Sequence, residues 1–420
     1  MRQVLVVGVI MIAIFGGIMS AAEAQNYELR GEVSEQADIF VQSPNDLDLL
    51  ISRLRLELLS ARGDNLAFRV LGSYEYDAVP KEKEWELKEA YIDYYSTLVD
   101  IRLGRQVIAW GTADEINPTD ILNPQKMTNI TDLKSTRKIG LFMVKADWRY
   151  HDYALQTIWK PEFDYMHLPE LDSPWAFFSL PGVVTLPEPD VPENTLENHE
   201  WAVKLSHTGT RFDYSLSYVY GWDNIFTPEI GFDAAMQQVT LQSLRFYRTQ
   251  MGGGDMAGNL GSIGIWGEAA FFLTEDDQGD DPDVKNPYFQ YIIGTDHTFD
   301  NGVKIALQYF QELITKIDDD AEETSEEDII SKLGNGMPLQ QAMTLRLEKK
   351  FGAGETKDVE LFMIYDLKYD GLLLKPSFSF SPQDAVTIEL GVVIFNGDST
   401  SIFGRFEDND KVYAKCTYSF

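Results

Sequence analysis

The chain has 420 residues, of which 44% are hydrophobic and 12% aromatic. Its 67 acidic residues outnumber 35 basic ones, and the resulting net charge of −32 argues against binding to nucleic acid or to anionic membrane surfaces. The single cysteine, Cys416, excludes an internal disulfide, a cysteine-rich zinc cluster and c-type haem attachment.

Residues 1–24 have the pattern of a cleavable secretory signal peptide. Arg2 supplies a positive start, an apolar run extends from Val4 to Ile18, and Ala22-Glu23-Ala24 gives the small-x-small cleavage pattern. An N-terminal membrane anchor is the alternative, but the stretch is short for a span and the cleavage pattern follows it directly. We therefore expect export and a mature barrel domain over residues 25–420.

Beyond residue 24 the apolar residues follow the pattern of membrane strands. No run approaches the roughly 20 consecutive apolar residues that a transmembrane helix needs. Apolar residues instead recur at every second position, as in a strand with one face on lipid and the other on water. We count about 18 strands, with 16 or 14 as alternatives, at residues 27–41, 47–61, 65–77, 86–96, 98–109, 136–149, 152–160, 199–207, 210–222, 240–256, 261–274, 288–298, 303–315, 339–351, 358–369, 372–381, 386–395 and 410–420.

The connections between these segments are alternately short and long, as in a barrel with both chain ends in the periplasm. The short ones are at residues 62–65, 96–97, 150–151, 207–209, 257–260, 299–302, 352–357 and 382–385. The long ones are at residues 77–85, 110–135, 161–198, 223–239, 275–287, 316–338 and 396–409. Outward connections near Pro44 and at Asp370-Gly371 are short and depart from the rule. The sequence predicts an all-β fold: a transmembrane antiparallel up-and-down β-barrel with long extracellular loops and short periplasmic turns.

Individual strands support this fold. Tyr214, Leu216 and Tyr218 share one strand face, whereas Ser215 and Ser217 take the other. A strand of a soluble sandwich shows the same alternation, so the number and spacing of such segments favour the barrel. Aromatic residues at strand ends predict two girdles at the membrane interfaces, an outer one of Trp85, Trp159, Trp201 and Trp222 and an inner one of Trp148, Phe351, Phe380 and Phe420.

The last strand alternates up to the final residue, with Val412, Ala414, Cys416, Tyr418 and Phe420 on one face. This pattern resembles the C-terminal signal that outer-membrane barrels present to their assembly machinery, with Tyr418 and Phe420 as its residues. An ordinary edge strand that ends in phenylalanine is the alternative. We expect an outer-membrane location, with outer-membrane lipid and the barrel assembly machinery as partners.

Charged residues occupy the strand faces opposite the apolar stripes. They cannot face lipid, where Arg or Lys at the bilayer midplane costs about 2–4 kcal/mol. One interpretation is a wet lumen braced by ion pairs, and the other is a solute path with a basic ladder on the early strands, since barrels of this size leave an aqueous channel unless loops fill it. The predicted pore-lining residues are Arg53, Arg55, Glu57, Arg69, Glu75, Glu89, Asp93, Asp100, Arg102, Gln106, Lys145, Lys204, Lys304, Arg346 and Glu348.

One strand and its loop carry a distinctive motif. Gly104-Arg105-Gln106 leads through Trp110-Gly111 into a loop that contains Asn117-Pro118. Between Leu103 and Pro124 the chain resembles a family of bacterial outer-membrane porin-like proteins and, more distantly, alginate-export-type porins. The resemblance implies an outer-membrane barrel with a transport role and no particular substrate. An arginine-dominated lumen, as alginate export implies, fits poorly because acids accompany nearly every arginine.

The same motif is a candidate for a pore constriction. Alternation places Gly104 and Gln106 toward the lumen and Arg105 on the other face. Either a bulge near Gly104 turns Arg105 inward, or Arg105 pairs at the wall. We predict that the loop folds into the pore, and a structural clamp between strand and loop is the alternative. The residues assigned to the constriction are Gly104, Arg105, Trp110, Gly111, Asn117 and Pro118.

Two outward loops are dense in acidic residues. Residues 275–283 and 318–323 offer oxygen ligands suited to Ca²⁺ or Mg²⁺, but their spacing matches no calcium-binding motif. A solvated charge run is the alternative, and at the outer face such charge would attract cations toward the mouth. We predict no resident metal and no cofactor.

Nothing in the chain indicates an enzyme, because the five histidines lie in no nucleophile elbow, metal-binding helix or P-loop pattern. The predicted function is passive transport of a solute through the lumen. One alternative is a non-conducting structural or export-accessory barrel with a periplasmic transport partner. Another is a carrier of hydrophobic compounds, with the loop 161–198 as a hatch, since Phe163, Tyr165 and Trp175 make this loop more aromatic than a polar channel needs.

Overall fold

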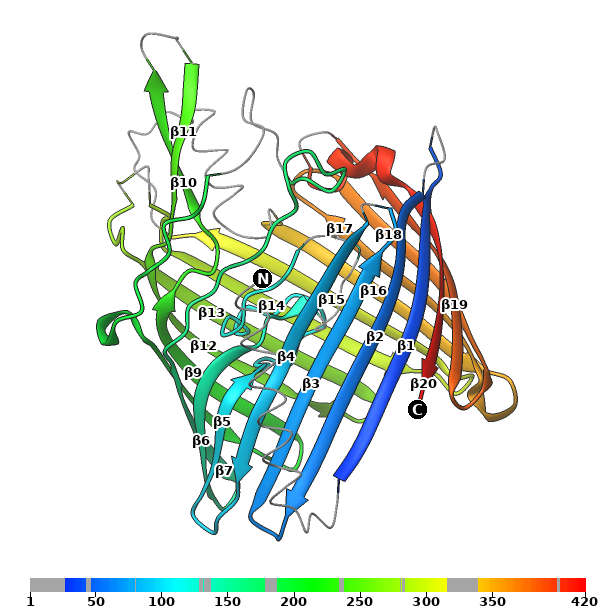
Figure 1. Cartoon of the computed structure of the whole chain (residues 1–420), viewed down its shortest axis with the longest axis horizontal. Helices are drawn as coiled ribbons and strands as arrows, with labels where there is room; N and C mark the ends of the chain where they lie inside the picture. Colours follow the sequence, from blue (N-terminus) through cyan, green and yellow to red (C-terminus); the bar gives the residue numbers. More distant parts are fainter. Residues whose placement is uncertain are drawn as a thin grey trace.

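The protein is a closed antiparallel barrel of 18 strands (Figure 1). Consecutive strands pair around the ring, β9 pairs with β12, and β20 pairs with β1 to close it. Within the described ranges no helix is long and apolar enough to cross a membrane. The predicted signal peptide lies outside the described residues. The computed structural model describes residues 27–42, 47–79, 81–127, 131, 137–177, 187–233, 238–279, 281, 284–315, 339–398 and 401–420.

The barrel strands fall into two runs on either side of a separate hairpin. The first run is β1 (Tyr27–Phe40), β2 (Leu47–Arg62), β3 (Leu66–Asp77), β4 (Glu82–Tyr94), β5 (Val99–Gln106), β6 (Leu141–Tyr150), β7 (Tyr153–Lys160), β8 (Glu200–His207) and β9 (Phe212–Trp222). The second is β12 (Arg248–Leu260), β13 (Ile263–Thr274), β14 (Tyr288–Thr298), β15 (Val303–Ile314), β16 (Gln341–Phe351), β17 (Lys357–Asp366), β18 (Gly371–Gln383), β19 (Val386–Asn396) and β20 (Lys411–Ser419). The hairpin is β10 (Thr227–Asp233) and β11 (Gln238–Arg245), and the short helices are η2 (Leu196–Asn198), η3 (Ala353–Glu355) and η4 (Gly404–Asn409).

The period-two pattern of the sequence becomes the two faces of the wall. On β9, Leu216 is 67% exposed, whereas the neighbouring Ser215 is 4% exposed. On β14, Ile293 is 63% exposed and Ile292 only 1%. Large apolar side chains on the outside of a closed barrel require a lipid environment, and closure gives every barrel strand a hydrogen-bonded neighbour on both sides. The predicted fold class and the strand count of 18 are confirmed.

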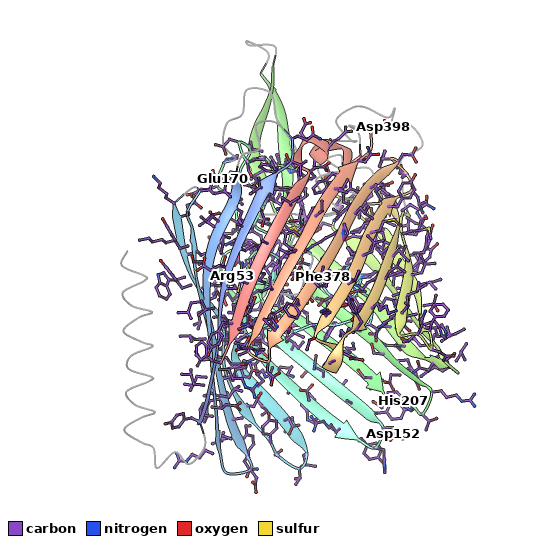
Figure 2. All side chains as sticks on the ribbon, turned by 90° about the vertical axis from the view of Figure 1, so that its right-hand side faces the viewer. Arg53, Asp152, Glu170, His207, Phe378 and Asp398 are labelled. Atoms are coloured by element: carbon purple, nitrogen blue, oxygen red, sulfur yellow. The ribbon has the colours of Figure 1, made fainter. Side chains whose placement is uncertain are left out.

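The two ends of the barrel differ as predicted. Asp152 and His207 mark the end with the short turns, and Glu170 and Asp398 mark the end with the long loops (Figure 2). The turn between β6 and β7 has only two residues, 151–152, whereas 34 residues, 107–140, connect β5 to β6. The alternation of short and long connections is therefore a property of the barrel and not of how the strands were counted.

Four sequence-based boundaries are wrong. The strand predicted at 86–96 begins at Glu82, because residues 82–87 pair with residues 72–77 of β3, and the connection predicted to be long at 77–85 consists only of residues 78–81. The strand predicted at 98–109 ends at Gln106, and the strand predicted at 136–149 begins at Leu141, because side chains of β4 (Glu89) and of the intervening loop (Asn123) accept the backbone amides that follow β5. The strand predicted at 240–256 runs instead over β12, because residues 238–245 pair with 227–233 in a hairpin that stands above the rim (Figure 1).

One predicted girdle residue also faces a different environment. Trp222 was expected at the outer lipid interface, but its indole nitrogen donates to the Asn198 carbonyl at 3.1 Å and Arg248 stacks 4.1 Å from its ring centre. Trp85 and Trp201, also predicted for the outer girdle, are 73% and 55% exposed. The sequence pattern cannot distinguish Trp222 from Trp85 and Trp201, since the loops that cover Trp222 come from elsewhere in the chain.

The seam that closes the barrel joins β1 to β20. Phe420 and Gly31 exchange backbone hydrogen bonds of 2.8 and 2.9 Å, and a Cβ at Gly31 would lie 2.1 Å from the Phe420 ring. Nearer the outer rim, the Lys411 ammonium is 1% exposed and lies 2.7 Å from Asp38 and 3.1 Å from Asp48. Two carboxylates around one buried ammonium fix the register of the closing pair.

Candidate channel constriction

The motif strand β5 carries a glycine that no other residue can replace. Gly104 has a φ of +135°, and a Cβ there would lie 2.3 Å from the Ala90 carbonyl of β4. The close approach brings the two backbones together beside Arg102, whose guanidinium stacks 3.8 Å from the Tyr91 ring. The conformation and the missing side chain are both needed, so the predicted role of Gly104 is structural.

Side chains take over from the sheet where β5 ends. The Val107 amide donates to Glu89 at 3.1 Å, and the Ile108 amide donates to the Asn123 side chain at 2.8 Å. The same Asn123 amide group donates to the Ile139 carbonyl at 2.7 Å. One asparagine therefore replaces a strand neighbour on both sides and pairs backbone groups at the point where the chain leaves the wall.

Arg105 pairs at the wall, which is the second of the two arrangements considered for it. It shares its strand face with Leu103, which is 45% exposed to the outside. Its Nε donates to the Leu87 carbonyl of β4 at 2.7 Å, and Nη1 lies 3.6 Å from Glu162. Leu87 belongs to the outer part of β4, where the ladder with β5 has already ended. Arg105 thus satisfies a backbone acceptor that lacks a strand neighbour.

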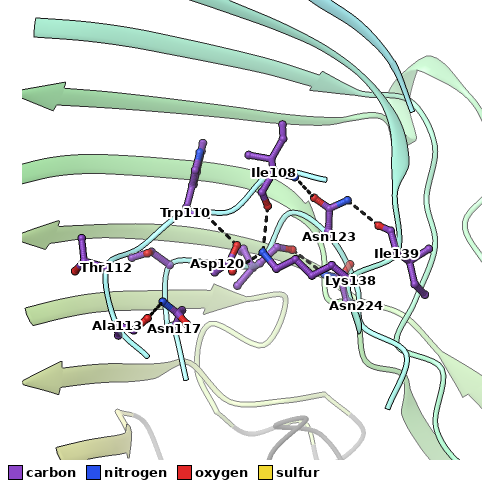
Figure 3. A network of polar contacts seen from close by, with 12 residues as sticks. Ile108, Trp110, Thr112, Ala113, Asn117, Asp120, Asn123, Lys138, Ile139 and Asn224 are labelled. Carbon is purple, nitrogen blue, oxygen red and sulfur yellow. Dashed lines mark hydrogen bonds and ion pairs between the residues drawn. The ribbon is translucent and has the colours of Figure 1, made fainter. Parts of the chain in front are cut away.

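A buried ion pair anchors the root of the loop (Figure 3). The Lys138 ammonium, 5% exposed, contacts Asp120 and donates to the Ile108 carbonyl at 3.1 Å. Asp120 also accepts the Trp110 amide at 3.1 Å. The Trp110 indole donates to Gln156 of β7 at 2.8 Å. These contacts tie the two ends of the 107–140 loop together inside the barrel.

The middle of the loop is bound to β13 through one carboxylate. Glu268 accepts the backbone amides of Thr112 and Ala113, the latter at 2.5 Å. It also accepts the Asn117 side-chain amide at 3.2 Å and the Thr119 hydroxyl at 3.1 Å. Glu268 is 3% exposed, and four donors from one loop converge on it. The loop is folded around this side chain.

Two further motif residues fit the same arrangement. Gly111 has a φ of +90°, and a Cβ there would lie 2.5 Å from a Glu268 oxygen. Pro118 follows Asn117 and lines a cavity between the loop and the wall. Trp110 is 4% exposed and packs in a buried cluster with Leu141. The structure thus brings Trp110, Gly111, Asn117 and Pro118 together in the lumen, and leaves Gly104 and Arg105 in the wall.

The tip of the loop reaches the far wall. Arg346 of β16 donates to Asp114 at 2.8 Å and lies 3.5 Å from Glu115, and its other side pairs with Glu360 of β17 at 2.8 Å. Gln308 of β15 donates to the Asp114 carbonyl at 2.8 Å. β16 is nine strands from β5 in a ring of 18, counted through β9 and β12. The loop therefore crosses the whole lumen and narrows it.

The remaining predicted pore-lining residues sit on strand faces that turn away from lipid and mostly form ion pairs. The pairs are Arg53–Glu75 (2.6 Å), Arg69–Glu57 (2.7 Å), Arg69–Glu89 (3.0 Å), Arg102–Asp93 (2.7 Å), Arg149–Asp100 (2.9 Å), Lys145–Asp147 (2.9 Å), Lys204–Asp255 (3.1 Å), Lys304–Asp296 (3.1 Å) and Lys350–Glu348 (3.1 Å). The Gln106 amide donates to the Met143 carbonyl at 2.8 Å. Arg55 has no hydrogen-bond or ion-pair partner among the described residues, which makes it a cation available to solutes.

Sequence reasoning missed two of these anchors. Glu268 was not selected, although it is a lone acid on the inward face of an otherwise apolar and glycine-rich strand. The Lys160–Glu200 pair, 2.8 Å apart and 2% and 6% exposed, was also missed. Lys160 donates to the Leu122 carbonyl at 3.2 Å and so holds the loop against β7. An isolated charge on an inward strand face is the signal that would have found both.

A second loop, from β7 toward β8, extends across the outer mouth to the barrel seam. Trp175 is 5% exposed, its indole donates to Asp48 at 3.2 Å, and the Lys411 ammonium lies 4.6 Å from its ring centre. Asn409 donates to the Pro174 carbonyl at 2.6 Å. The described part of the loop predicted as a hatch is therefore fastened on the far side of the mouth.

The acidic loop 275–283 is explained in part by its own backbone. Asp276 accepts the amides of Gln278 at 3.3 Å, Gly279 at 2.8 Å and Asp281 at 3.1 Å. Among the described residues no group of three or more histidine, cysteine or acidic side chains is arranged to hold a metal ion. The second acidic run, 318–323, lies outside the described residues.

An apolar exterior, a closed ring of 18 strands and a charged lumen narrowed by an inserted loop define an outer-membrane β-barrel of the channel type. No protein-family model and no curated protein matches the chain. Among solved structures, the chain is similar to Pseudomonas aeruginosa OccK11 (OpdR), with 9% identity, a TM-score of 0.53, and 94% of this chain and 96% of that one covered. It is also similar to Acinetobacter baumannii OccAB2, with 10% identity, a TM-score of 0.54, and 94% and 98% covered. At such identities the likeness concerns the fold.

Proposed function

We propose that this protein is a passive outer-membrane channel whose selectivity is set by the 107–140 loop. The observation that supports the proposal most directly is the attachment of the loop tip to Arg346 and Gln308 on the opposite wall. A loop that is attached on both sides of the lumen has a fixed position, and it leaves a narrow aqueous passage of defined shape beside it. Solutes would then pass between the loop and the charged strands β1 to β4.

The charges of the lumen favour a small solute over a large polyanion. Most arginines of the wall are neutralised by a neighbouring acid, as in the Arg53–Glu75 and Arg102–Asp93 pairs. The net charge of −32 adds a field that attracts cations to the barrel. Arg55 is a cation on the inward face of β2 that has no partner among the described residues and is available for a polar or anionic group of a solute. The likeness to alginate-export-type porins is therefore not extended to substrate.

Single-channel conductance of the refolded protein lacking residues 1–24 tests the proposal. In a planar bilayer we expect stepwise openings with cation preference. Arg346→Ala removes the far anchor of the loop tip and should give larger and noisier openings. Lys350→Ala is the matched control on the same strand, because Lys350 pairs with Glu348 near the turn and its side chain is 53% exposed.

Two outcomes would contradict the proposal. Protein shown to be folded by its heat-modifiable gel mobility but silent in the bilayer cannot be a passive channel, and a non-conducting structural or export-accessory barrel with a periplasmic partner would replace it. Conductance that is the same in Arg346→Ala and in the wild type would exclude the loop as the constriction while leaving the channel itself intact.

A carrier for hydrophobic compounds is the second candidate. The observation in its favour is the apolar cluster at the mouth, where Trp175 packs within 6.1 Å of Phe40, 5.9 Å of Phe395 and 5.7 Å of Phe406, measured between ring centres. As a hatch, the loop would open when Trp175 leaves this cluster. Three further predictions hold for either candidate function. They are cleavage by a signal peptidase, delivery by the barrel assembly machinery through Tyr418 and Phe420, and contact with outer-membrane lipid.

A further inference from the structure

A cavity lies between the constriction loop and the outer ends of β9 and β12 to β15. It opens toward solvent, and its space of about 1050 Å³ includes part of the open solvent at its mouth. Its apolar lining comes from both sides, with Ile116 and Met127 on the loop and Phe272, Tyr288 and Phe310 on the wall. It therefore lies above the constriction, on the side from which a solute would enter the barrel.

The wall of the cavity presents a flat aromatic surface. The rings of Phe272 and Tyr288 are 4.4 Å apart between centres and inclined by only 8° to each other. They are 4% and 7% exposed, so neighbouring side chains hold them in place. Flat, rigid ring surfaces favour planar apolar partners, which stack or pack against them at little cost in side-chain entropy.

The charged groups around the cavity are already occupied by protein partners. Lys285 lies 3.1 Å from Asp223, and Asp120 contacts Lys138. Glu115 is near Arg346, and the guanidinium of Arg137 donates to the Met127 sulfur at 3.1 Å. A charged ligand would have to displace one of these partners, which is costly. The lining thus favours a neutral ligand.

One polar group in the cavity stands out. The Tyr288 hydroxyl forms no hydrogen bond with any described residue, although the side chain is 7% exposed. The Tyr288 hydroxyl oxygen is not among the fully buried unpaired side-chain atoms of the described residues, so it faces the open space of the cavity and can pair with a ligand there. The Lys285 ammonium lies 4.7 Å from the ring centre and pairs with Asp223, so it does not serve the hydroxyl.

We propose that this cavity is a binding site for a neutral, planar, mainly apolar molecule that carries one hydroxyl or carbonyl group. The apolar body packs against Phe272 and the loop residue Ile116, and the polar group pairs with the Tyr288 hydroxyl. The inference rests on the proposed function in one respect, since it names the class of solute that would collect at the entrance of the constriction.

Binding of 1-naphthol to the folded protein in detergent tests the site, with empty micelles as the blank for partition into detergent. We expect saturable binding by calorimetry in the wild type. Tyr288→Phe should weaken it about 3- to 10-fold, the usual effect of losing one neutral hydrogen bond. Tyr291→Phe is the matched control, because Tyr291 lies on the same strand but faces outward toward Tyr309. Naphthalene, which lacks the hydroxyl, should bind the wild type as weakly as 1-naphthol binds Tyr288→Phe. 1-Naphthoate should bind the wild type at least about 10-fold more weakly than 1-naphthol, because its charge lacks a free partner.

The outcomes separate this site from the channel. Equal binding of 1-naphthol to wild type and Tyr288→Phe, equal binding of 1-naphthoate, or no saturation beyond the micelle blank would overturn the proposed site, whatever the conductance. Saturable, Tyr288-dependent binding to a protein that does not conduct would sustain the site and reject the passive channel. If both hold, 1-naphthol should reduce the single-channel current of the wild type and not that of Tyr288→Phe.

Discussion

Two sectors of the barrel wall are built in different ways. β1 to β4 have 14, 16, 12 and 13 residues and pair with one another along most of their length, with one register shift between β1 and β2 and one between β3 and β4. β5 to β8 have 8, 10, 8 and 8 residues and lie low in the wall (Figure 1). Above them, loop residues form isolated bridges, Gln125 with Lys138 and Lys126 with His167. The outer part of β4 consequently meets loop segments and not a strand.

The difference shows what each kind of wall requires. In the long-strand sector, inter-strand hydrogen bonds pair the backbone N–H and C=O groups, so the side chains need only alternate between apolar and polar. The short-strand sector satisfies its backbone with side chains such as Asn123, Arg105 and Lys138. Substitutions of these residues should therefore lower the free energy of unfolding more than similar substitutions on the long strands.

The largest effect is expected for Lys138→Met. It leaves Asp120 buried without its cation and removes a donor from the Ile108 carbonyl, which should lower the free energy of unfolding by about 3–5 kcal/mol. Lys350→Met, in an exposed pair on β16, which pairs with β17 in an unbroken ladder, should lower the free energy of unfolding by no more than about 1 kcal/mol. Denaturant unfolding followed by tryptophan fluorescence measures both, and equal losses would erase the contrast between the sectors.

A smaller loss is expected for Arg105→Leu. The change removes a charged hydrogen bond to the Leu87 carbonyl, worth about 1.5–3 kcal/mol, and leaves that carbonyl unpaired next to lipid. Arg149→Leu is the matched control, since Arg149 is 71% exposed and pairs with Asp100 at the inner end of β6. The same unfolding assay applies. If Arg105→Leu were as stable as the wild type, the loop segments would close the wall without help from Arg105.

The smallest effect is a pH dependence in the loop that borders the outer end of β1, where Val41 donates to the Asp410 carbonyl. Burial raises the pKa of Asp410, in the loop before β20, above its ordinary value of 3.8, against the opposing effect of the Phe395 amide that it accepts. Because the native state holds this proton more tightly, stability falls as the pH rises from the unfolded-state pKa through the native one.

Asp410→Asn keeps the acceptor and removes the charge. The variant should therefore gain stability relative to the wild type at pH 8 and show little gain at pH 3, as measured by thermal unfolding at the two values. Asp384→Asn, in the turn between β18 and β19, controls for the overall reduction of negative charge. An equal gain at both pH values would refute the assignment to Asp410.

The constriction could be located from the sequence only in part. The motif from Gly104 to Pro118 marked the right loop, because glycines and an Asn-Pro step interrupt an alternating strand. Its partners Glu268 and Arg346 come from strands more than 150 residues away, and a period-two pattern gives their face but not what crosses the lumen to meet them. Trp222 failed as a girdle residue for the same reason.

The sequence by itself predicted about 18 strands, the alternation of short turns and long loops, and an inward face for the charged residues of the strands. These depend on local periodicity, which lipid on one side and water on the other impose on every strand. Only the tertiary structure decided that a loop takes the place of the outer ends of β5 to β8, that its tip reaches β16, and that a cavity with an unpaired Tyr288 hydroxyl lies above it. These features depend on pairings between distant segments, whose register is fixed when the ring closes through β1 and β20.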